Sequence, residues 1–500
     1  MEIPVPVPVV PQTLIDFLGS IGFHGSLREL SPVIFVAVTI LSWPIAHALR
    51  YINSPKVRLT ICSLVGVLSV FIVYGFPTFL LFAMFVTLFY IPARYGLVAP
   101  SLITFLDICL LGWVHYECML TGTATDAMSL TGTLMTMAAK ISMFGYHMHD
   151  GLLIKKGAKT LSSMSHIDAQ RKATAIISPP SYLEYMAYMF DFMGGLVGPL
   201  FTFREYFDFI NREGDFVKID TVSLRNQIVK AMTRAFAILG FYLYLDSTGV
   251  FTKSALITNF DQVFASLPFH YRLGLLSFAL ASCRFVYYTV WALTEVTCVI
   301  AGIAYMPPYH FTRSRNVNLR AVESCTNTNQ MTSNWNIRTS DTWLKQCIYQ
   351  RLEHVPSWIP GRIAKLISRK GLANLLTKVT SAIWHGWYPG YVVSFLSLGL
   401  MNMTESVIRQ RVHPLIPGKI LNSRIASVLA WLHTWTSVNI FFGPFIVLTW
   451  EGIHTFNSSI YYVFHLYHLA LIVGVKLLFS RPRSMGAHPA SPSRDHKKSQ

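Results

Sequence analysis

Charge is scarce in this sequence. Asp, Glu, Lys and Arg make up 13% of its 500 residues, against about 25% in an average soluble protein, and the mean hydropathy is +0.43. A chain this long with so few charges cannot cover a globular surface with polar groups. Because its apolar segments are continuous and do not alternate, the sequence predicts an all-α polytopic membrane protein.

Acidic residues and closely spaced cysteines are also few. Lys and Arg number 41 against 24 Asp and Glu, giving a net charge of +17. No basic cluster interleaved with aromatics stands outside the apolar segments, so we assign this charge to cytosolic loops and anionic lipid, not to nucleic acid. The seven cysteines include no CxxC pair, which argues against a metal site and a disulfide framework. The start of the chain lacks a basic n-region, so the first apolar segment is expected to direct insertion.

The apolar segments predict about eleven spans, judged against roughly 20 apolar residues per span. They lie near 32–48, 59–75, 77–91, 97–115, 128–147, 182–202, 227–246, 274–305, 376–400, 426–450 and 457–479. Segment 274–305 is long enough to be bent or doubled. We expect a short N-terminal head (1–30), one transmembrane domain (31–480) and a basic, disordered tail (481–500).

The longest hydrophilic stretch, 306–370, has many more Lys and Arg than acids, which predicts a cytosolic position. The tail is basic as well and is expected on the same side. Within 306–370, six apolar residues recur at helical spacing, which predicts an amphipathic helix in the interface, dipping into the protein, or packed at the surface: Trp343, Leu344, Cys347, Ile348, Leu352 and Val355.

His385 is the first candidate for chemistry. A titratable ring in an apolar segment is costly and is by default a functional candidate, although a lone histidine is more often a satisfied structural residue. Gly386, Pro389 and Gly390 follow it and predict a helix break, which at membrane depth is tolerated where backbone lines a cavity. The aromatic neighbours Trp384, Trp387, Tyr388 and Tyr391 suit a ligand with an apolar body and a polar head.

Three other polar residues stand out. Asn336, in the run Trp335 to Thr339, can hydrogen-bond without charge and could orient a base or stabilise an oxyanion; the alternative is a helix-cap or turn asparagine. Arg284 and Glu295 are about three turns apart and project from one face of a helix. Structural ion pairing is the simpler role for both, and binding of a phosphate by Arg284 is the alternative.

Two runs resemble the signature motifs of the membrane-bound O-acyltransferase family, most closely its lysophospholipid acyltransferase branch. They are Trp335-Asn336-Ile337-Arg338-Thr339 with Trp343-Leu344-Lys345, and Trp384-His385-Gly386 with Tyr388-Pro389-Gly390-Tyr391. Upstream blocks extend the resemblance over about residues 140–400: His149-Asp150-Gly151, Leu183-Glu184-Tyr185, Phe192-Met193-Gly194, Gly198-Pro199-Leu200, and Arg284 to Glu295. Asp191 departs from the asparagine of many relatives, which leaves the acceptor lipid open.

The resemblance implies transmembrane helices around a central substrate chamber, with interfacial or re-entrant helices. It implies transfer of an acyl group from acyl-CoA to the hydroxyl of a lysophospholipid, with His385 as general base and Asn336 assisting. It further suggests substrate contacts from Trp335, Arg338, Trp384, Gly386, Tyr388, Pro389, Tyr391, Arg284 and Glu295. No metal or permanently bound cofactor is expected, and a homo-oligomer is left open.

Two other functions remain open at this point. One is acylation of another alcohol or of a protein, and the other is a polytopic transporter, although no repeated halves with paired Gly or Pro interruptions are visible. Lys497 and Lys498 resemble a dilysine retrieval signal, which favours a multi-pass protein of the endoplasmic reticulum membrane with a cytosolic tail.

Overall fold

The computed structural model describes residues 31–121, 130–157, 166–194, 196–217, 219, 221–308, 310–352 and 369–479. The predicted head and tail, with Lys497 and Lys498, lie outside these residues, as does Val355. The described residues contain helices, one isolated β-bridge between Met306 and His310, and no strand. This agrees with the predicted all-α class.

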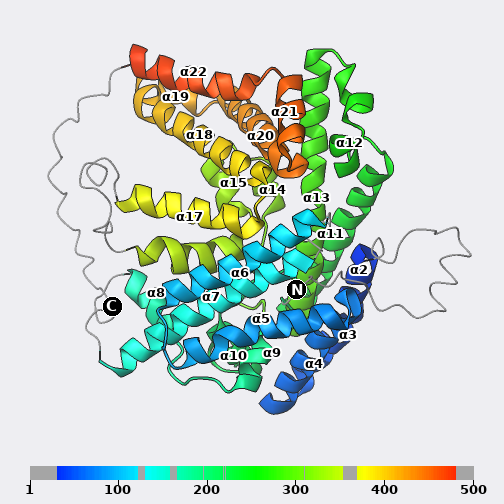
Figure 1. Ribbon diagram of the computed structural model, residues 1–500, viewed down its shortest axis with the longest axis vertical. Coiled ribbons are helices and arrows are strands. Elements are labelled where there is room, and N and C mark those ends of the chain that lie inside the picture. Colours follow the sequence, from blue (N-terminus) through cyan, green and yellow to red (C-terminus); the bar gives the residue numbers. More distant parts are fainter. Residues whose placement is uncertain are drawn as a thin grey trace, which may run out of the picture.

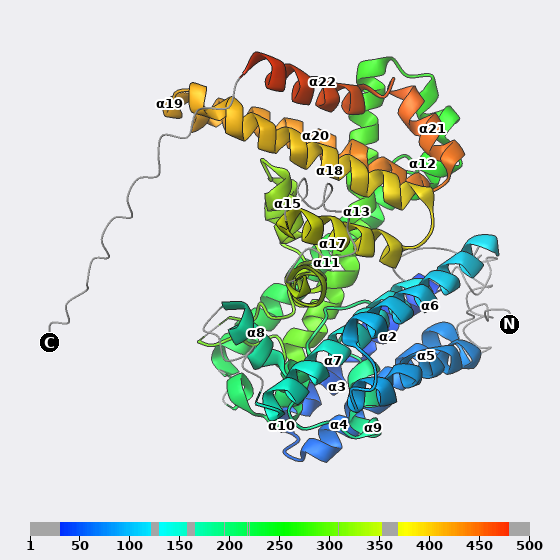
Figure 2. The same cartoon turned by 60° about the vertical axis from the view of Figure 1, so that its left-hand side comes forward.

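The helices form two groups (Figures 1 and 2). The lower group contains α2 (Ser31–Leu41), α3 (Trp43–Ala48), α4 (Pro55–Tyr74), α5 (Phe76–Arg94), α6 (Pro100–Leu120), α7 (Leu130–Lys155), α8 (His166–Thr174), α9 (Tyr182–Met189) and α10 (Phe203–Asn211). The upper group contains α18 (Pro389–Arg411), α19 (Gly418–Leu421), α20 (Arg424–Val447), α21 (Trp450–Ser459) and α22 (Val463–Leu478).

The helix α13 (Phe269–Ala301) links the two groups, since it packs against α3 below and α20 above, with α11 (Thr221–Ser247) along its side. Its 33 residues form one unbroken helix, neither doubled nor interrupted. Near α13 lie α12 (Lys253–Ile257), α14 (Leu319–Glu323) and α15 (Thr328–Asn334). The π-helix η6 (Thr339–Ile348) and α17 (Arg369–His385) contact each other between the two groups.

Eight described helices are long and apolar enough to cross a membrane, or nine if the pair α21 and α22, bent by 73°, counts as one span. The sequence predicted about eleven spans, and eight or nine candidates stand among the described residues. Segment 182–202 is not a span: α9 has eight residues, begins at a capping box between Ser181 and Glu184, and ends before an irregular stretch. The apolar residues of that stretch, including Phe190 and Phe201, are buried in the protein core and do not face lipid.

Two other predicted spans also do not form single exposed apolar helices. Of segment 128–147, the described residues 130–147 belong to α7, which carries Lys140, His147 and Asp150 and is buried along most of its length. Segment 376–400 is divided between α17 and α18 by the break after His385. The helix predicted around Trp343 is η6, whose residues Trp343 and Cys347 are fully buried, and η6 packs against α7. It therefore lies inside the protein.

Candidate active site

His385 is the last residue of α17, at the predicted helix break. Gly386 follows with φ of +123°, a conformation that L side chains rarely adopt. Pro389 is the first residue of α18, where its missing N–H costs no helical hydrogen bond. The break therefore has a local cause in the sequence, and it places the His385 ring at the end of a helix.

Aromatic rings surround the His385 side chain. Ring centroids of Trp384, Phe445 and Tyr391 lie 4.9, 5.1 and 5.7 Å from the imidazole centroid, and Phe395 lies at 5.7 Å. The histidine is half-buried, and no described residue hydrogen-bonds its ring nitrogens. Both nitrogens are thus left for a ligand within an apolar enclosure.

The end of α17 is fixed to α6 and α7. The Trp384 indole donates a hydrogen bond to the Met135 carbonyl on α7 at 2.8 Å, and the Trp384 carbonyl lies 3.2 Å from Nε2 of His115 on α6. The Trp387 indole donates to the Gly112 carbonyl, also on α6, at 2.9 Å. The backbone on both sides of His385 is therefore held by the lower helix group.

Asn336 lies in a tight turn between α15 and η6, with φ of +47°, which asparagine tolerates better than most residues. The following backbone is held by Asn316: the Ile337 amide donates to its carbonyl at 2.8 Å, and the Arg338 amide donates to its side-chain Oδ1 at 3.2 Å. The preceding Trp335 ring packs edge-on against Trp291, with centroids 5.1 Å apart. These contacts on both sides fix the turn.

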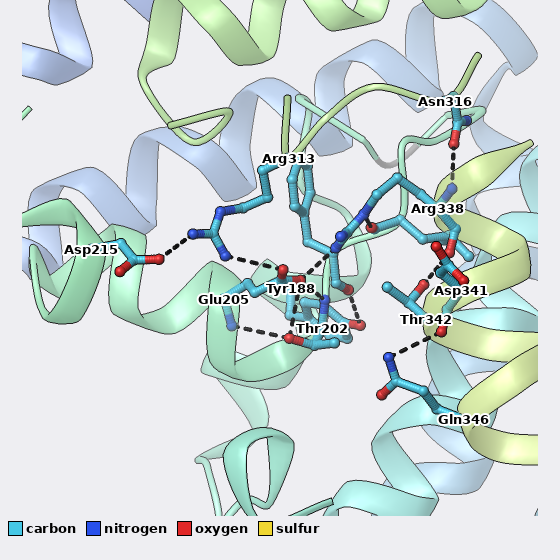
Figure 3. A network of polar contacts seen from close by, with 12 residues as sticks. Tyr188, Thr202, Glu205, Asp215, Arg313, Asn316, Arg338, Asp341, Thr342 and Gln346 are labelled. Atoms are coloured by element: carbon cyan, nitrogen blue, oxygen red, sulfur yellow. Dashed lines mark hydrogen bonds and ion pairs between the residues drawn. The ribbon is translucent and has the colours of Figure 1, made fainter. Parts of the chain in front are cut away.

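Arg338 extends away from Asn336 to the polar network shown in Figure 3. Its guanidinium donates to Glu205 at 2.6 Å and to the Leu200 carbonyl at 2.7 Å. Glu205 also pairs with Arg313 at 3.2 Å and forms a capping box with Thr202 at the start of α10. Burial raises the pKa of Glu205, but the two guanidinium groups lower it, and the balance leaves the carboxyl pKa below its ordinary value.

Two cavities border His385. The smaller one, of about 90 Å³, extends toward α6 and α7 and is bordered by His115 and Met135. The larger one, of about 250 Å³, extends between α17 and α18 and is bordered by Lys378 and Ser394. The two cavities share six residues: Tyr287, Trp291, Asn336, Trp384, His385 and Phe445. His385 and Asn336, far apart in sequence, therefore lie where the two cavities meet.

The other predicted substrate contacts divide into three sets. Trp335, Trp384, Tyr391 and Arg284 line one or both cavities. Gly386, Tyr388 and Pro389 shape the break between α17 and α18 and do not line either cavity. Arg338 and Glu295 do not line them either, and each is held in ion pairs.

The ion pairs of Arg284 and Glu295 are separate from each other. Arg284 pairs with Glu323 at 2.7 Å, and Glu295 pairs with Arg234 at 2.8 Å. Burial raises the pKa of Glu323, whereas Arg284 lowers it, and the net pKa is below the ordinary value. Arg284 therefore reaches the larger cavity with its charge already compensated.

Two basic side chains of the cavities, His115 and Lys378, were not named from the sequence. His115 stands on a helix far from the motifs, and nothing near it in the sequence marks it. Lys378 precedes His385 by seven residues, which places both on one face of α17, so spacing could have identified it. No acidic side chain among the described residues lines the larger cavity or pairs with Lys378. In the described ranges, no group of three or more His, Cys, Asp or Glu is arranged to hold a metal ion.

Comparison with known proteins agrees with these motifs. The sequence profile of the membrane-bound O-acyltransferase family matches residues 108–447, which include both cavities' shared residues. The chain belongs to this family. Family membership favours an acyltransferase over the transporter left open above, and it accounts for the multi-pass membrane architecture of this O-acyltransferase.

Curated relatives match the acyltransferase over most of its length. Human membrane-bound glycerophospholipid O-acyltransferase 1 is 26% identical, covering 84% of this chain and 83% of the relative. Lysophospholipid acyltransferase 2 of Arabidopsis thaliana is 25% identical, covering 86% and 90%. Lysophospholipid acyltransferase 1 of the same plant is 25% identical, covering 91% and 95%.

Proposed function

We propose that the protein transfers an acyl group from acyl-CoA to the free hydroxyl of a lysophospholipid, giving a phospholipid and free CoA. The names of several relatives point to this substrate class. The observation that carries the proposal is the meeting of two cavities at His385 and Asn336. A two-substrate reaction needs such a junction, because donor and acceptor must approach the same atoms from different directions.

The His385 imidazole is assigned the role of general base. Its free ring nitrogen takes the proton of the acceptor hydroxyl as the oxygen attacks the thioester carbonyl carbon. When the C–S bond breaks, the CoA thiolate leaves, and the proton held by His385 returns to sulfur. The surrounding aromatic rings exclude water that would otherwise compete with the lipid as nucleophile.

Asn336 is assigned to the charge that develops on the thioester oxygen. Its side-chain amide is a neutral donor at the cavity junction, and its backbone is held on both sides, so little reorganisation is needed during the reaction. Removing one such donor in other enzymes costs about 10²–10³-fold in rate. His385 and Asn336 together therefore supply a base and an electrophilic donor.

Lys378 supports a phosphate-bearing substrate. Its ammonium group borders the larger cavity, which no described acid lines, about 10 Å along the helix axis from His385. The hydroxyl of Ser394, which lines the same cavity, is buried and has no hydrogen-bond partner in the described structure. An uncompensated cation and an unpaired donor in one cavity fit an anion, and both lysophospholipids and CoA carry phosphate.

The remaining assignments extend the same proposal. The membrane is that of the endoplasmic reticulum, with the basic tail and Lys497-Lys498 in the cytosol. Acyl-CoA is a co-substrate and not a bound cofactor. Acylation of another alcohol or of a protein is the alternative that an assay must separate.

The test is purified protein in detergent with labelled acyl-CoA and a panel of lysophospholipids that differ in head group. The expected result is labelled diacyl phospholipid with at least one acceptor, at a rate that falls to background in His385→Ala. If the wild type forms no diacyl product with any lysophospholipid but labels a sterol, a fatty alcohol or a peptide, the proposed substrate class is wrong.

A further inference from the structure

His115 lies beside the reaction centre but belongs to neither signature motif. It stands on α6, one turn after Gly112, and is 2% exposed. Its ring borders the smaller cavity together with His385 and Asn336. Its Nε2 lies 3.2 Å from the backbone carbonyl of Trp384, the residue directly before His385.

This contact determines the tautomer of His115. A carbonyl oxygen only accepts hydrogen bonds, so Nε2 carries the hydrogen and donates it to Trp384. A second proton would place a charge in a buried site where no described carboxylate faces it. The ring is therefore neutral, and Nδ1 is an acceptor. Nδ1 is buried and has no partner in the described structure.

The backbone after His385 is shaped around this ring. A Cβ atom on Gly386 would lie 3.0 Å from Nδ1 of His115 and 3.1 Å from its Cγ, which is tighter than ordinary van der Waals contact. Only glycine combines this close approach with φ of +123°. His115 thus contacts the residue before His385 through a hydrogen bond and the residue after it through packing.

We propose that His115 is a positioning residue for His385. It holds the last turn of α17 through the Trp384 carbonyl and packs against Gly386, and in this way it fixes the direction in which the His385 ring enters the cavity junction. The carbonyls at a helix C-terminus lack intrahelical donors, so without His115 the Trp384 carbonyl loses this donor. Among the described hydrogen bonds, the last turn of α17 is then held to α6 and α7 only through the indoles of Trp384 and Trp387. This inference rests on the proposed acyl transfer and names a residue that the reaction requires outside the family motifs.

The expected effect is on turnover and not on substrate affinity. A displacement of about 1 Å at a reacting group can cost roughly 10²-fold in rate. We expect His115→Leu, which fills similar volume without a donor, to lower kcat by about 10- to 100-fold. The KM for acyl-CoA and for lysophospholipid should stay within about twofold, because His115 acts through His385 and the transition state.

Two further variants separate positioning from general stability. His115→Gln keeps an amide N–H that can reach the Trp384 carbonyl, and it should restore kcat to within about fivefold of wild type. Thr104→Val is the matched control. It removes another buried hydrogen bond of α6, between the hydroxyls of Thr104 and Ser142 at 2.7 Å, but Thr104 lies three turns before His115 and borders neither cavity. It should keep wild-type kcat.

Rates are normalised to the folded protein in the monodisperse size-exclusion peak, and kcat and KM are measured for both substrates. The inference is supported if His115→Leu loses kcat alone and His115→Gln recovers it. It is overturned if His115→Leu keeps kcat, if His115→Gln is as impaired as His115→Leu, or if Thr104→Val is equally impaired. Absence of diacyl product from the wild type would instead contradict the proposed function.

Discussion

The ion-pair network behind Asn336 gives the most direct test of how the site is held. The Glu205 carboxylate forms ion pairs with the guanidinium groups of Arg338 at 2.6 Å and Arg313 at 3.2 Å. Arg338 is two residues after Asn336. The change Glu205→Gln removes the charge and one acceptor oxygen. The amide oxygen can keep the capping box with Thr202, and the amide NH2 then faces the Arg313 guanidinium, to which it cannot offer an acceptor. We expect the change to destabilise the protein and to lower kcat by loosening the turn that carries Asn336.

The loss of stability in Glu205→Gln depends on which partners each arginine keeps. Arg313 keeps Asp215 as a second acid, whereas the Arg338 guanidinium keeps no acid among the described residues and retains the Leu200 carbonyl and the face of the Phe201 ring. The Arg338 side chain is 14% exposed. Removing one partner of a buried ion pair costs about 3–5 kcal/mol. Discounting for this partial exposure and for the amide that replaces the carboxylate gives about 2–3 kcal/mol.

The assay is the melting midpoint of detergent-purified protein, followed by tryptophan fluorescence, together with kcat. The midpoint of Glu205→Gln should fall by several degrees at pH 7. Because the folded-state pKa of Glu205 is depressed, its stabilisation is present at neutral pH and is lost as the pH falls through that pKa. The difference between wild type and variant should therefore shrink as the pH is lowered below about 4.5.

Lys345→Gln is the matched control for this prediction. Lys345 forms an ion pair with Asp341 at 3.3 Å on the same π-helix, but the two side chains are 51% and 60% exposed. Such a pair contributes about 0–1 kcal/mol, so the control should melt close to the wild type. Wild-type midpoint and kcat in Glu205→Gln at pH 7 would refute the role of the network.

The remaining predictions concern the cavities. His385→Ala should lower turnover at least 10²-fold with an unchanged size-exclusion profile; full activity would contradict its role as base. Asn336→Ala should lower kcat severely, and a rise in KM alone would make it a binding residue. Lys378→Met should raise the KM of one phosphate-bearing substrate about tenfold or more, with Lys378→Arg close to wild type. Unchanged KM values for both acyl-CoA and lysophospholipid would exclude Lys378 as a phosphate contact.

Composition and local signals predicted much of this fold. The scarcity of charge predicted a helical membrane protein, and Gly386 with Pro389 predicted the break after His385. Segments 128–147 and 182–202 were predicted as spans, but most of their described apolar residues are buried by protein. In α7 and in the stretch after α9, hydropathy alone cannot separate a residue that packs in the core from one that faces lipid, because both environments select apolar side chains.

The polar residues of the site were predicted less completely than the fold, because their partners lie far away in the sequence. Arg338 was named because it belongs to the motif around Asn336, but its acid, Glu205, comes from a distant helix, and a sequence does not reveal long-range pairing. For Glu295 structural ion pairing was the simpler prediction, but its partner, Arg234, could not be named from the sequence. His115 has no local signal at all, whereas Lys378 has one, the spacing of seven residues to His385. Residues that act through neighbours in space are thus the ones that sequence reasoning omits.

A ring contact joins the segments that carry His385 and Asn336. Trp384 directly precedes His385, and Trp343 lies on the π-helix that follows Asn336. Their rings pack with centroids 5.1 Å apart, and the Trp343 ring is fully buried. Since α6 and α7 fix Trp384 and the Asn316 and Glu205 contacts fix the Asn336 turn, this ring pair joins two separately held halves. The junction of the cavities therefore stays defined even though the connecting chain between the motifs is long.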